Sequence, residues 1–210
     1  MTDIIPLGDR LVGVDPNDGG ENEGVIGSRY MNVFKIDQAI KGGDPLTIAD
    51  DAANIHDAKY IYVDKQGVGS GTAKRLQRIK ETKLKTVAIN AGEKITKDDK
   101  LPDGENPSQY LNQRAYIYWQ TKLWIEGGGK IPYDQELVKQ LLAIKYKNSS
   151  GGAIQIIPKD LLRKPYYNIH DLGRADVLSF TFSPKKPRVF IMPYDGGNAG
   201  VQPYYPDIGI

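Results

Sequence analysis

The 210-residue sequence contains no cysteine and only two histidines, His56 and His170. The lack of cysteine excludes disulfides, zinc–thiolate sites and thiol nucleophiles. With only two histidines, a histidine-rich metal site or a Ser-His-Asp triad is not favoured. We expect His56 to be structural. No run of about 18 apolar residues occurs, and the N-terminus lacks the basic-then-apolar pattern of a signal peptide, so we expect no membrane segment.

The sequence also lacks a recognisable ATP-binding loop. The stretch GVGSG at 67–71 follows a predicted strand, but threonine and lysine stand at positions 72 and 74, where the nucleotide-binding motifs require glycine. The stretch GGGKI at 127–131 lacks both the upstream glycine and the hydroxyl residue of the phosphate-binding loop.

What is present is the composition of a single globular domain, with 40% hydrophobic and 26% charged residues. The net charge of +2 conceals an asymmetry, because residues 1–64 carry 12 acidic and 5 basic side chains and residues 65–210 carry 14 acidic and 23 basic ones. An acidic cluster in an otherwise basic chain is typical of a metal site that acts on a polyanion. Uneven surface charge would give the same asymmetry, so composition leaves both readings open.

Residues 59–76 form the most informative stretch. A short run of strand-forming residues, 60–63, ends at Asp64, and glycines at alternate positions lead into a segment with helical spacing. An acidic side chain therefore stands at the carboxyl end of a buried strand, where open α/β sheets bind ligands. The glycines and the basic residues that follow would let a phosphate backbone pass close to Asp64. The alternative is that these basic residues form an ordinary solvent-exposed helix face. The candidate DNA-contacting residues are Lys65, Gly67, Gly69, Lys74 and Arg75.

The remaining pattern predicts an α/β fold with a mixed sheet. We expect an antiparallel meander of strands at 11–15, 25–30 and 31–37, then a helix at 46–57, a strand at 59–64, a helix at 71–82 and a parallel strand at 86–90.

The second half is predicted to be mainly helical. A long surface loop at 91–108 precedes a helix at 109–126 with core aromatics, and a short helix follows with Leu137, Leu141 and Leu142 on its apolar side. A strand pair at 143–146 and 153–157, a helical turn at 158–164 and a final helix at 171–182 complete the domain, 1–182. Residues 183–210 are predicted to be a Pro/Gly/Tyr-rich extension, peripheral to the chemistry.

Three aspartates stand in contexts that are hard to explain as surface: Asp15, Asp64 and Asp176. Together they would suit hard divalent cations, Mg²⁺ or Mn²⁺, and two such ions could activate a water and stabilise the leaving oxygen in phosphodiester cleavage. The alternative is that each aspartate ends or caps its own element. Asp171 competes with Asp176 for the third place but suits an N-cap better, and His170 could lean into the site as a weak ligand.

The order of several motifs resembles the nuclease domain of tailed-phage terminase large subunits. The resemblance covers roughly residues 10–182. Its blocks are LVGVDP, YIYVDKQGVGSGTAKRL, LNQRAYIYWQTKLWIEGG with KIPYDQELVKQL, IQIIPKDLLRK and DLGRADVLSFTF.

The resemblance implies an RNase H-like fold, a central mixed β-sheet flanked by helices on both sides. It further implies a metal-dependent endonuclease that cuts concatemeric viral double-stranded DNA during genome packaging in the host-cell cytoplasm. Implied partners are an ATPase motor domain, a small terminase subunit and a portal. By motif, Asp15, Asp64 and Asp176 match the family's metal ligands, and Lys159 matches a lysine often found beside the site.

Two features depart from the family pattern. Relatives commonly carry an acidic residue or histidine three positions before the last aspartate, where this chain has Gly173, so His170 or Asp171 would have to supply a fourth ligand. The ATPase half is missing, and we expect it to have been excised or to reside on another chain. The alternative functions are an RNase H-like resolvase or integrase, which would act on branched or recombining DNA, and a non-catalytic DNA-binding packaging module.

Overall fold

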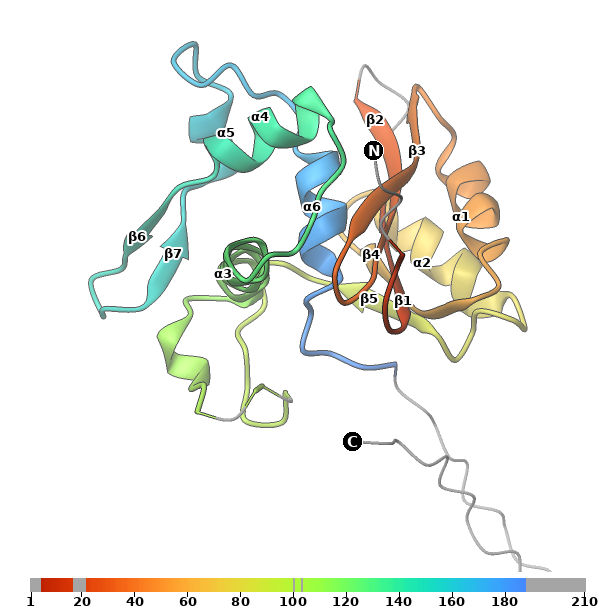
Figure 1. Ribbon diagram of the computed structural model, residues 1–210, viewed down its shortest axis with the longest axis horizontal. Helices are drawn as coiled ribbons and strands as arrows, with labels where there is room; N and C mark the ends of the chain where they lie inside the picture. Colours follow the sequence, from red (N-terminus) through yellow and green to blue (C-terminus); the bar gives the residue numbers. More distant parts are fainter. Residues whose placement is uncertain (1–4, 17–21, 100, 103, 188–210) are drawn as a thin grey trace, which may run out of the picture.

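A mixed five-stranded sheet with the strand order β3-β2-β1-β4-β5 forms the centre of the computed structural model, which describes residues 5–16, 22–99, 101–102 and 104–187 (Figure 1). Strands β1, β2 and β3 form the expected antiparallel meander, and β4 and β5 extend the sheet in parallel from β1. The strands are β1 (Arg10–Asp15), β2 (Glu23–Arg29), β3 (Phe34–Lys41), β4 (Ala58–Asp64) and β5 (Thr86–Ile89).

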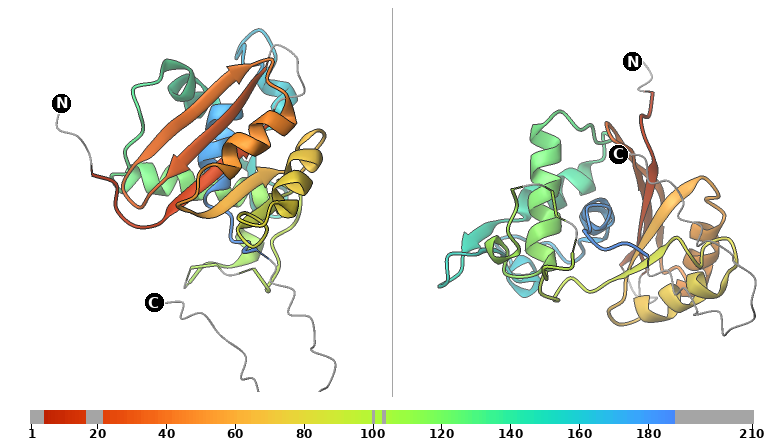
Figure 2. Two further views of the ribbon diagram at one scale, coloured as in Figure 1. Left: turned by 90° about the vertical axis from the view of Figure 1, so that its right-hand side faces the viewer. Right: turned by 90° about the horizontal axis from the view of Figure 1, so that it is seen from below.

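Helices cover both faces of this sheet, as Figure 2 shows in its right-hand view. Helices α1 (Pro45–Ala53) and α2 (Gly69–Arg78) lie on one face. Helix α6 (Gly173–Phe180) lies on the other, with α3 (Gln113–Glu126) beyond it. The outer layer also holds the short helix η1 (Pro107–Gln109), α4 (Gln135–Ala143), α5 (Lys159–Leu162) and a hairpin of β6 (Tyr146–Asn148) and β7 (Ile154–Ile156).

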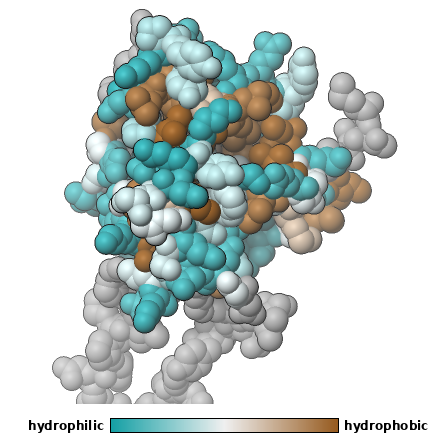
Figure 3. All heavy atoms as spheres, turned by 90° about the vertical axis from the view of Figure 1, so that its left-hand side faces the viewer, coloured by the Kyte–Doolittle hydropathy of each residue, from teal (hydrophilic) through white to brown (hydrophobic). Residues whose placement is uncertain are grey.

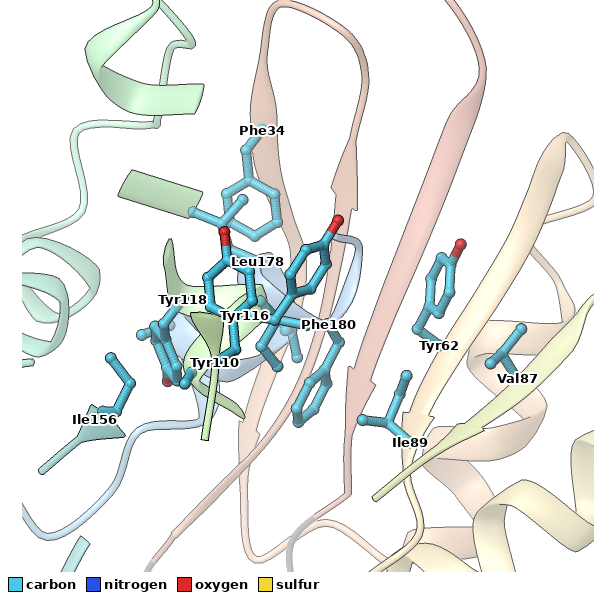
Figure 4. Packing of buried hydrophobic residues seen from close by; sticks show 14 of the residues in the cluster. Phe34, Tyr62, Val87, Ile89, Tyr110, Tyr116, Tyr118, Ile156, Leu178 and Phe180 are labelled. Atoms are coloured by element: carbon cyan, nitrogen blue, oxygen red, sulfur yellow. The ribbon is translucent and has the colours of Figure 1, made fainter. Parts of the chain in front are cut away.

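The two faces of the sheet bury separate hydrophobic cores because side chains alternate along each strand. Val12 and Val14 of β1 pack under α1 and α2. On the opposite face, Tyr62 of β4 packs in one cluster with residues of α3 and α6, among them Tyr116 and Phe180 (Figure 4). The position of a residue along a strand therefore decides which layer its side chain meets.

Several predicted boundaries were wrong by a few residues. The third strand begins at residue 34 rather than 31, because residues 30–33 form a turn in which the Tyr30 N–H donates to the Val33 carbonyl at 2.8 Å. Helix α3 begins at 113 rather than 109, because the Asn112 side chain caps it by accepting from the Ala115 N–H at 3.0 Å.

Other elements are also shorter than predicted. Helix α1 ends at 53 rather than 57, α2 spans 69–78 rather than 71–82, and α6 spans 173–180 rather than 171–182. In the hairpin, β6 occupies 146–148 rather than 143–146, because α4 continues through residue 143. The predicted extension from 183 lies outside the described residues from 188 onward.

One predicted core residue lies at the surface. Leu142 of α4 is 68% exposed, whereas Leu137 of the same helix is fully buried. Leu142 borders an apolar groove of about 460 Å³ between α3, α4 and β6, together with Trp119, Ile144 and Tyr146. Figure 3 looks onto this side of the molecule, where hydrophobic residues gather in patches among hydrophilic ones. No helix within the described ranges is both long and apolar enough to cross a membrane.

Candidate metal centre

Two parallel neighbouring strands place Asp15 and Asp64 side by side at the same edge of the sheet. Each aspartate is the last residue of its strand, and the preceding residues, Val14 and Val63, are paired in the register of β1 and β4. By alternation Asp15 shares a face with Gly13, and Asp64 shares it with Tyr62. That face is the one that α6 covers, so both carboxylates point toward the helix that carries the third predicted aspartate.

Gly13 lets α6 approach the sheet closely. A Cβ built on Gly13 would lie 2.0 Å from the carbonyl oxygen of Val177, a separation that no real side chain can adopt. The backbone of α6 therefore rests directly on β1 at the residue after Asp176. This contact fixes the height of Asp176 above the ends of β1 and β4 and explains why a strand interior, where glycine is otherwise unfavourable, contains one here.

Asp176 is 3% exposed, and both of its carboxylate oxygens have partners. The Tyr118 hydroxyl donates to Oδ1 at 2.5 Å, and the Lys159 ammonium donates to Oδ2 at 2.8 Å. The carboxylate raises the pKa of Lys159, with a smaller contribution from Asp15. Lys159, whose side chain is 47% exposed, therefore acts as a counter-ion to all three aspartates, with its ion pair on Asp176.

The three carboxylates disfavour one another's charge. Burial, followed by the charge of Asp176, holds the pKa of Asp15 well above its usual range, and Lys159 opposes this shift. Burial also raises the pKa of Asp64, although the backbone N–H of Gln66 donates to its Oδ1 at 3.0 Å and partly offsets the effect. Three carboxylates around one ammonium form an electrostatically unfavourable group that an added cation would relieve.

The donor set fits a hard divalent cation, because such ions prefer carboxylate oxygens. The present arrangement is not a closed metal site: among the residues that the structure describes, no three His, Asp or Glu side chains form a ready-made metal-binding group. At Asp176, the Lys159 ammonium already donates to Oδ2. An ion bound to that oxygen would have to compete with Lys159.

A cleft of about 380 Å³ opens beside these residues. Its walls come from the ends of β1 and β2, the loop after β4, α5 and the segment before α6. Among its lining residues are Asp15, Glu23, Gly67, Lys159, His170 and Asp171.

Neither candidate for the fourth ligand is free of other contacts. Asp171 accepts the backbone N–H of Gly173 at 2.9 Å through Oδ1 and that of Glu23 at 3.2 Å through Oδ2. The predicted N-cap role was wrong by one position, because α6 has Leu172 at its N-cap. His170 is exposed, and its Nε2 lies 3.0 Å from the side-chain oxygen of Asn168.

The glycine loop after β4 serves two purposes. Gly67 is exposed, has a φ of +56° and lines the cleft, so glycine here permits both the turn and close approach from outside. Gly69 is buried instead, and a Cβ on it would lie 1.8 Å from the Asp64 carbonyl oxygen. Glycine at 69 is thus required for packing α2 against the end of β4, which contributes to the placement of Asp64.

The three basic residues predicted near DNA differ in their surroundings. Lys74 is exposed on α2. Lys65 forms an ion pair with Glu93 at 2.7 Å, and Arg75 forms one with Asp50 at 2.8 Å.

Sequence reasoning missed Tyr118, which was assigned with the other aromatics of its helix to the core. Its ring is in the core, but its hydroxyl reaches Asp176 from 58 residues away. It also missed Arg174, which joins Glu23 and Asp134 at 2.8 and 2.5 Å and ties the start of α6 to β2 and α4. Helical spacing contains no signal for either contact, because both depend on how separate elements pack.

Solved structures share this fold. The nuclease domain of the large terminase subunit of bacterial virus Sf6 superposes with a TM-score of 0.66 at 19% identity, covering 85% of this chain and 89% of that one. A lysine-to-alanine variant of that domain, solved with manganese and β-thujaplicinol, gives the same TM-score at 18% identity and the same coverage.

The large terminase nuclease of thermophilic phage G20c, solved with bound magnesium, gives a TM-score of 0.53 at 16% identity, covering 86% of this chain and 83% of that one. No protein-family model and no curated protein matches the sequence. The chain thus has the RNase H-like fold of phage terminase nuclease domains, as the motif order implied.

Proposed function

We propose that this chain is the nuclease domain of a tailed-phage terminase large subunit, a divalent-metal-dependent endonuclease that cuts concatemeric viral double-stranded DNA during genome packaging. The observation that carries the proposal is the meeting of Asp15, Asp64 and Asp176 from β1, β4 and α6 around Lys159, beside an open cleft. The shared fold and the motif order support it, and both reference domains were solved with divalent metals.

In this proposal Asp15, Asp64 and Asp176 hold Mg²⁺ or Mn²⁺. When bound, two such ions would activate a water and stabilise the leaving oxygen of the phosphodiester. Lys159 balances the charge of Asp176 and Asp15, and its half-exposed side chain lines the cleft that a phosphate would enter. His170 and Asp171 line the same cleft and stay candidates for a further ligand.

Duplex DNA would be bound through its phosphates, with Lys65, Lys74, Arg75 and the backbone at Gly67 as candidate contacts. Gly69 is withdrawn as a contact, because it is buried against the end of β4. Such contacts do not read base sequence, so we expect cutting by the isolated domain to be non-specific and its DNA binding to weaken with salt. The terminase motor domain, small subunit and portal are the proposed partners in the host-cell cytoplasm, and they would direct where the DNA is cut.

The test is nicking and linearisation of a supercoiled plasmid by the purified chain in Mn²⁺, in Mg²⁺ and in EDTA. We expect cutting only with metal, and a loss of more than about 100-fold in Asp64→Ala and in Asp176→Ala, since even outer partners of metal ligands are worth 10–100-fold. Asp160→Ala is the matched control, because Asp160 follows Lys159 and its side chain is 91% exposed.

Cutting that persists in EDTA, or that both substitutions leave intact, would refute the metal-dependent assignment. A strong preference for four-way junctions over linear duplex would support a resolvase-type nuclease instead. Salt-sensitive DNA binding without cutting in either metal would support a packaging module that only binds DNA.

A further inference from the structure

Helix α3 places a buried phenol directly behind the acidic centre. Tyr118 is 5% exposed, and its hydroxyl donates to Asp176 Oδ1 at 2.5 Å. Figure 4 shows Tyr118 in the hydrophobic cluster that fills the space between α3, α6 and the sheet. Because Oδ1 is held on this buried side, the other oxygen, Oδ2, is the one that meets Lys159.

The phenol is itself held in place. Arg114, one turn earlier in α3, lies with its guanidinium carbon 5.5 Å from the centroid of the Tyr118 ring. The same guanidinium donates through Nη1 to the Ile157 carbonyl at 2.8 Å, two residues before Lys159. Helix α3 therefore fixes both partners of Asp176, the phenol directly and the lysine through the segment that carries it.

We propose that Tyr118 is a positioning residue that locks the Asp176 carboxylate so that Oδ2, the oxygen that meets Lys159, is presented to a divalent cation. This role rests on the proposed metal-dependent function. An outer hydrogen bond that orients a ligating carboxylate typically contributes 10–100-fold to metal affinity. Lys159 cannot supply this orientation, because its side chain is half exposed and its ammonium carries the same sign of charge as the ion with which it competes.

The experiment is a calorimetric titration of the full chain with Mn²⁺, comparing wild type with Tyr118→Phe, which removes one oxygen atom and leaves the ring. We expect the variant to bind Mn²⁺ about 10–100-fold more weakly. Tyr116→Phe is the control, because Tyr116 is 3% exposed in the same cluster and its ring packs edge-on against Tyr110 at 5.1 Å. This control should bind Mn²⁺ as the wild type does.

Repeating the titration in an Asp176→Asn variant separates a positioning effect of Tyr118 from a packing effect. If Tyr118 acts through Asp176, then Tyr118→Phe should change Mn²⁺ affinity by less than about 2-fold when Asp176→Asn is already present, because contacting residues are coupled and not additive. Tyr118→Phe leaves one oxygen of a buried carboxylate unpaired, so it should lower the melting temperature in EDTA by about 2–12 °C. DNA binding in EDTA should be nearly the same in wild type and Tyr118→Phe. The positioning role would be overturned if Tyr118→Phe lowered Mn²⁺ affinity equally with and without Asp176→Asn. It would also be overturned if Tyr116→Phe lowered Mn²⁺ affinity as much as Tyr118→Phe does.

The outcomes for the two proposals are distinguishable. If wild type and Tyr118→Phe bind Mn²⁺ equally tightly, the positioning role alone is overturned and the nuclease assignment stands. Wild type that binds no Mn²⁺ overturns both.

Discussion

The close approach of α6 to β1 makes Gly13→Ala the most informative single substitution in the scaffold of the site. The new Cβ would lie 2.0 Å from the Val177 carbonyl oxygen, 2.7 Å from its carbonyl carbon and 2.9 Å from its Cα. Ordinary contact begins at 3.4 Å, so strand and helix must separate by an amount on the order of 3.4 − 2.0 = 1.4 Å along this line. The clashing atoms are backbone, and no rotamer change can relieve them.

Two consequences follow, of different size. Overpacking of this kind costs about 1–3 kcal/mol, and we place Gly13→Ala at about 3 kcal/mol because a whole helix must move. For a chain of this length that predicts a fall in melting temperature of about 6–12 °C. Since Val177 follows Asp176 directly, the carboxylate moves with it, and a displacement of about 1 Å in a catalytic group lowers rate by about 100-fold.

The assay pairs thermal melting with plasmid cleavage in Mn²⁺, at a temperature where the variant is fully folded. Gly71→Ala is the matched control, because a Cβ there meets nothing within 4 Å and the residue lies in α2. We expect it to keep full cleavage and to gain about 0.4–1 kcal/mol of stability. A Gly13→Ala variant that melts and cuts like the wild type would refute the view that this glycine sets the position of Asp176.

Three further predictions concern charged side chains other than the three aspartates and Lys159. Lys74→Ala should weaken duplex DNA binding in EDTA and lower the slope of log affinity against log salt by about 1. Arg75→Ala should have a smaller effect, because the Arg75 guanidinium is already paired with Asp50. Fluorescence anisotropy over a salt series measures both slopes, and equal effects of the two substitutions would contradict this prediction. Arg174→Met should cost about 2 kcal/mol in urea denaturation because it strands two partly buried carboxylates, against less than about 0.5 kcal/mol for Lys122→Met, which breaks an exposed pair. Hydrogen bonds from two lysines lower the pKa of Glu93 from 4.5 to about 2, so its stabilising contribution is present above pH 4.5 and is lost as pH falls toward 2. The difference in stability between wild type and Glu93→Gln should shrink over that interval, and a difference independent of pH would contradict the ion pairing.

The sequence predicted the sheet and the edge that carries the site, because both depend on local signals. Strand-forming runs that end in Asp15 and Asp64 placed two carboxylates at strand ends, and the helical segments between strands indicated parallel pairing. The mixed sheet with helices on both faces was thus confirmed. Boundaries were less accurate where a side chain decides them, as at the Asn112 cap of α3.

What could not be predicted depends on contacts between distant segments. Helical spacing assigned Tyr118 to the core but gave no indication that its hydroxyl would meet Asp176. The strand pattern at 11–15 contains no signal that the backbone of α6 packs directly against Gly13. The assignment of metal ligands by motif stays a prediction, since Lys159 occupies one oxygen of Asp176 in the structure.

The central claim is that Asp15, Asp64 and Asp176, from three distant segments, hold one metal centre, and localised cleavage of the protein by bound Fe²⁺ tests it most directly. Fe²⁺ stands next to Mn²⁺ in the order of affinities for a given N/O/S site, and with ascorbate and peroxide it cuts the backbone near where it is bound. We predict fragments ending near residues 15, 64 and 176 together, suppressed by excess Mg²⁺ and absent from Asp64→Ala. Cuts at only one of these positions, or cuts elsewhere that Mg²⁺ does not suppress, would contradict a shared centre.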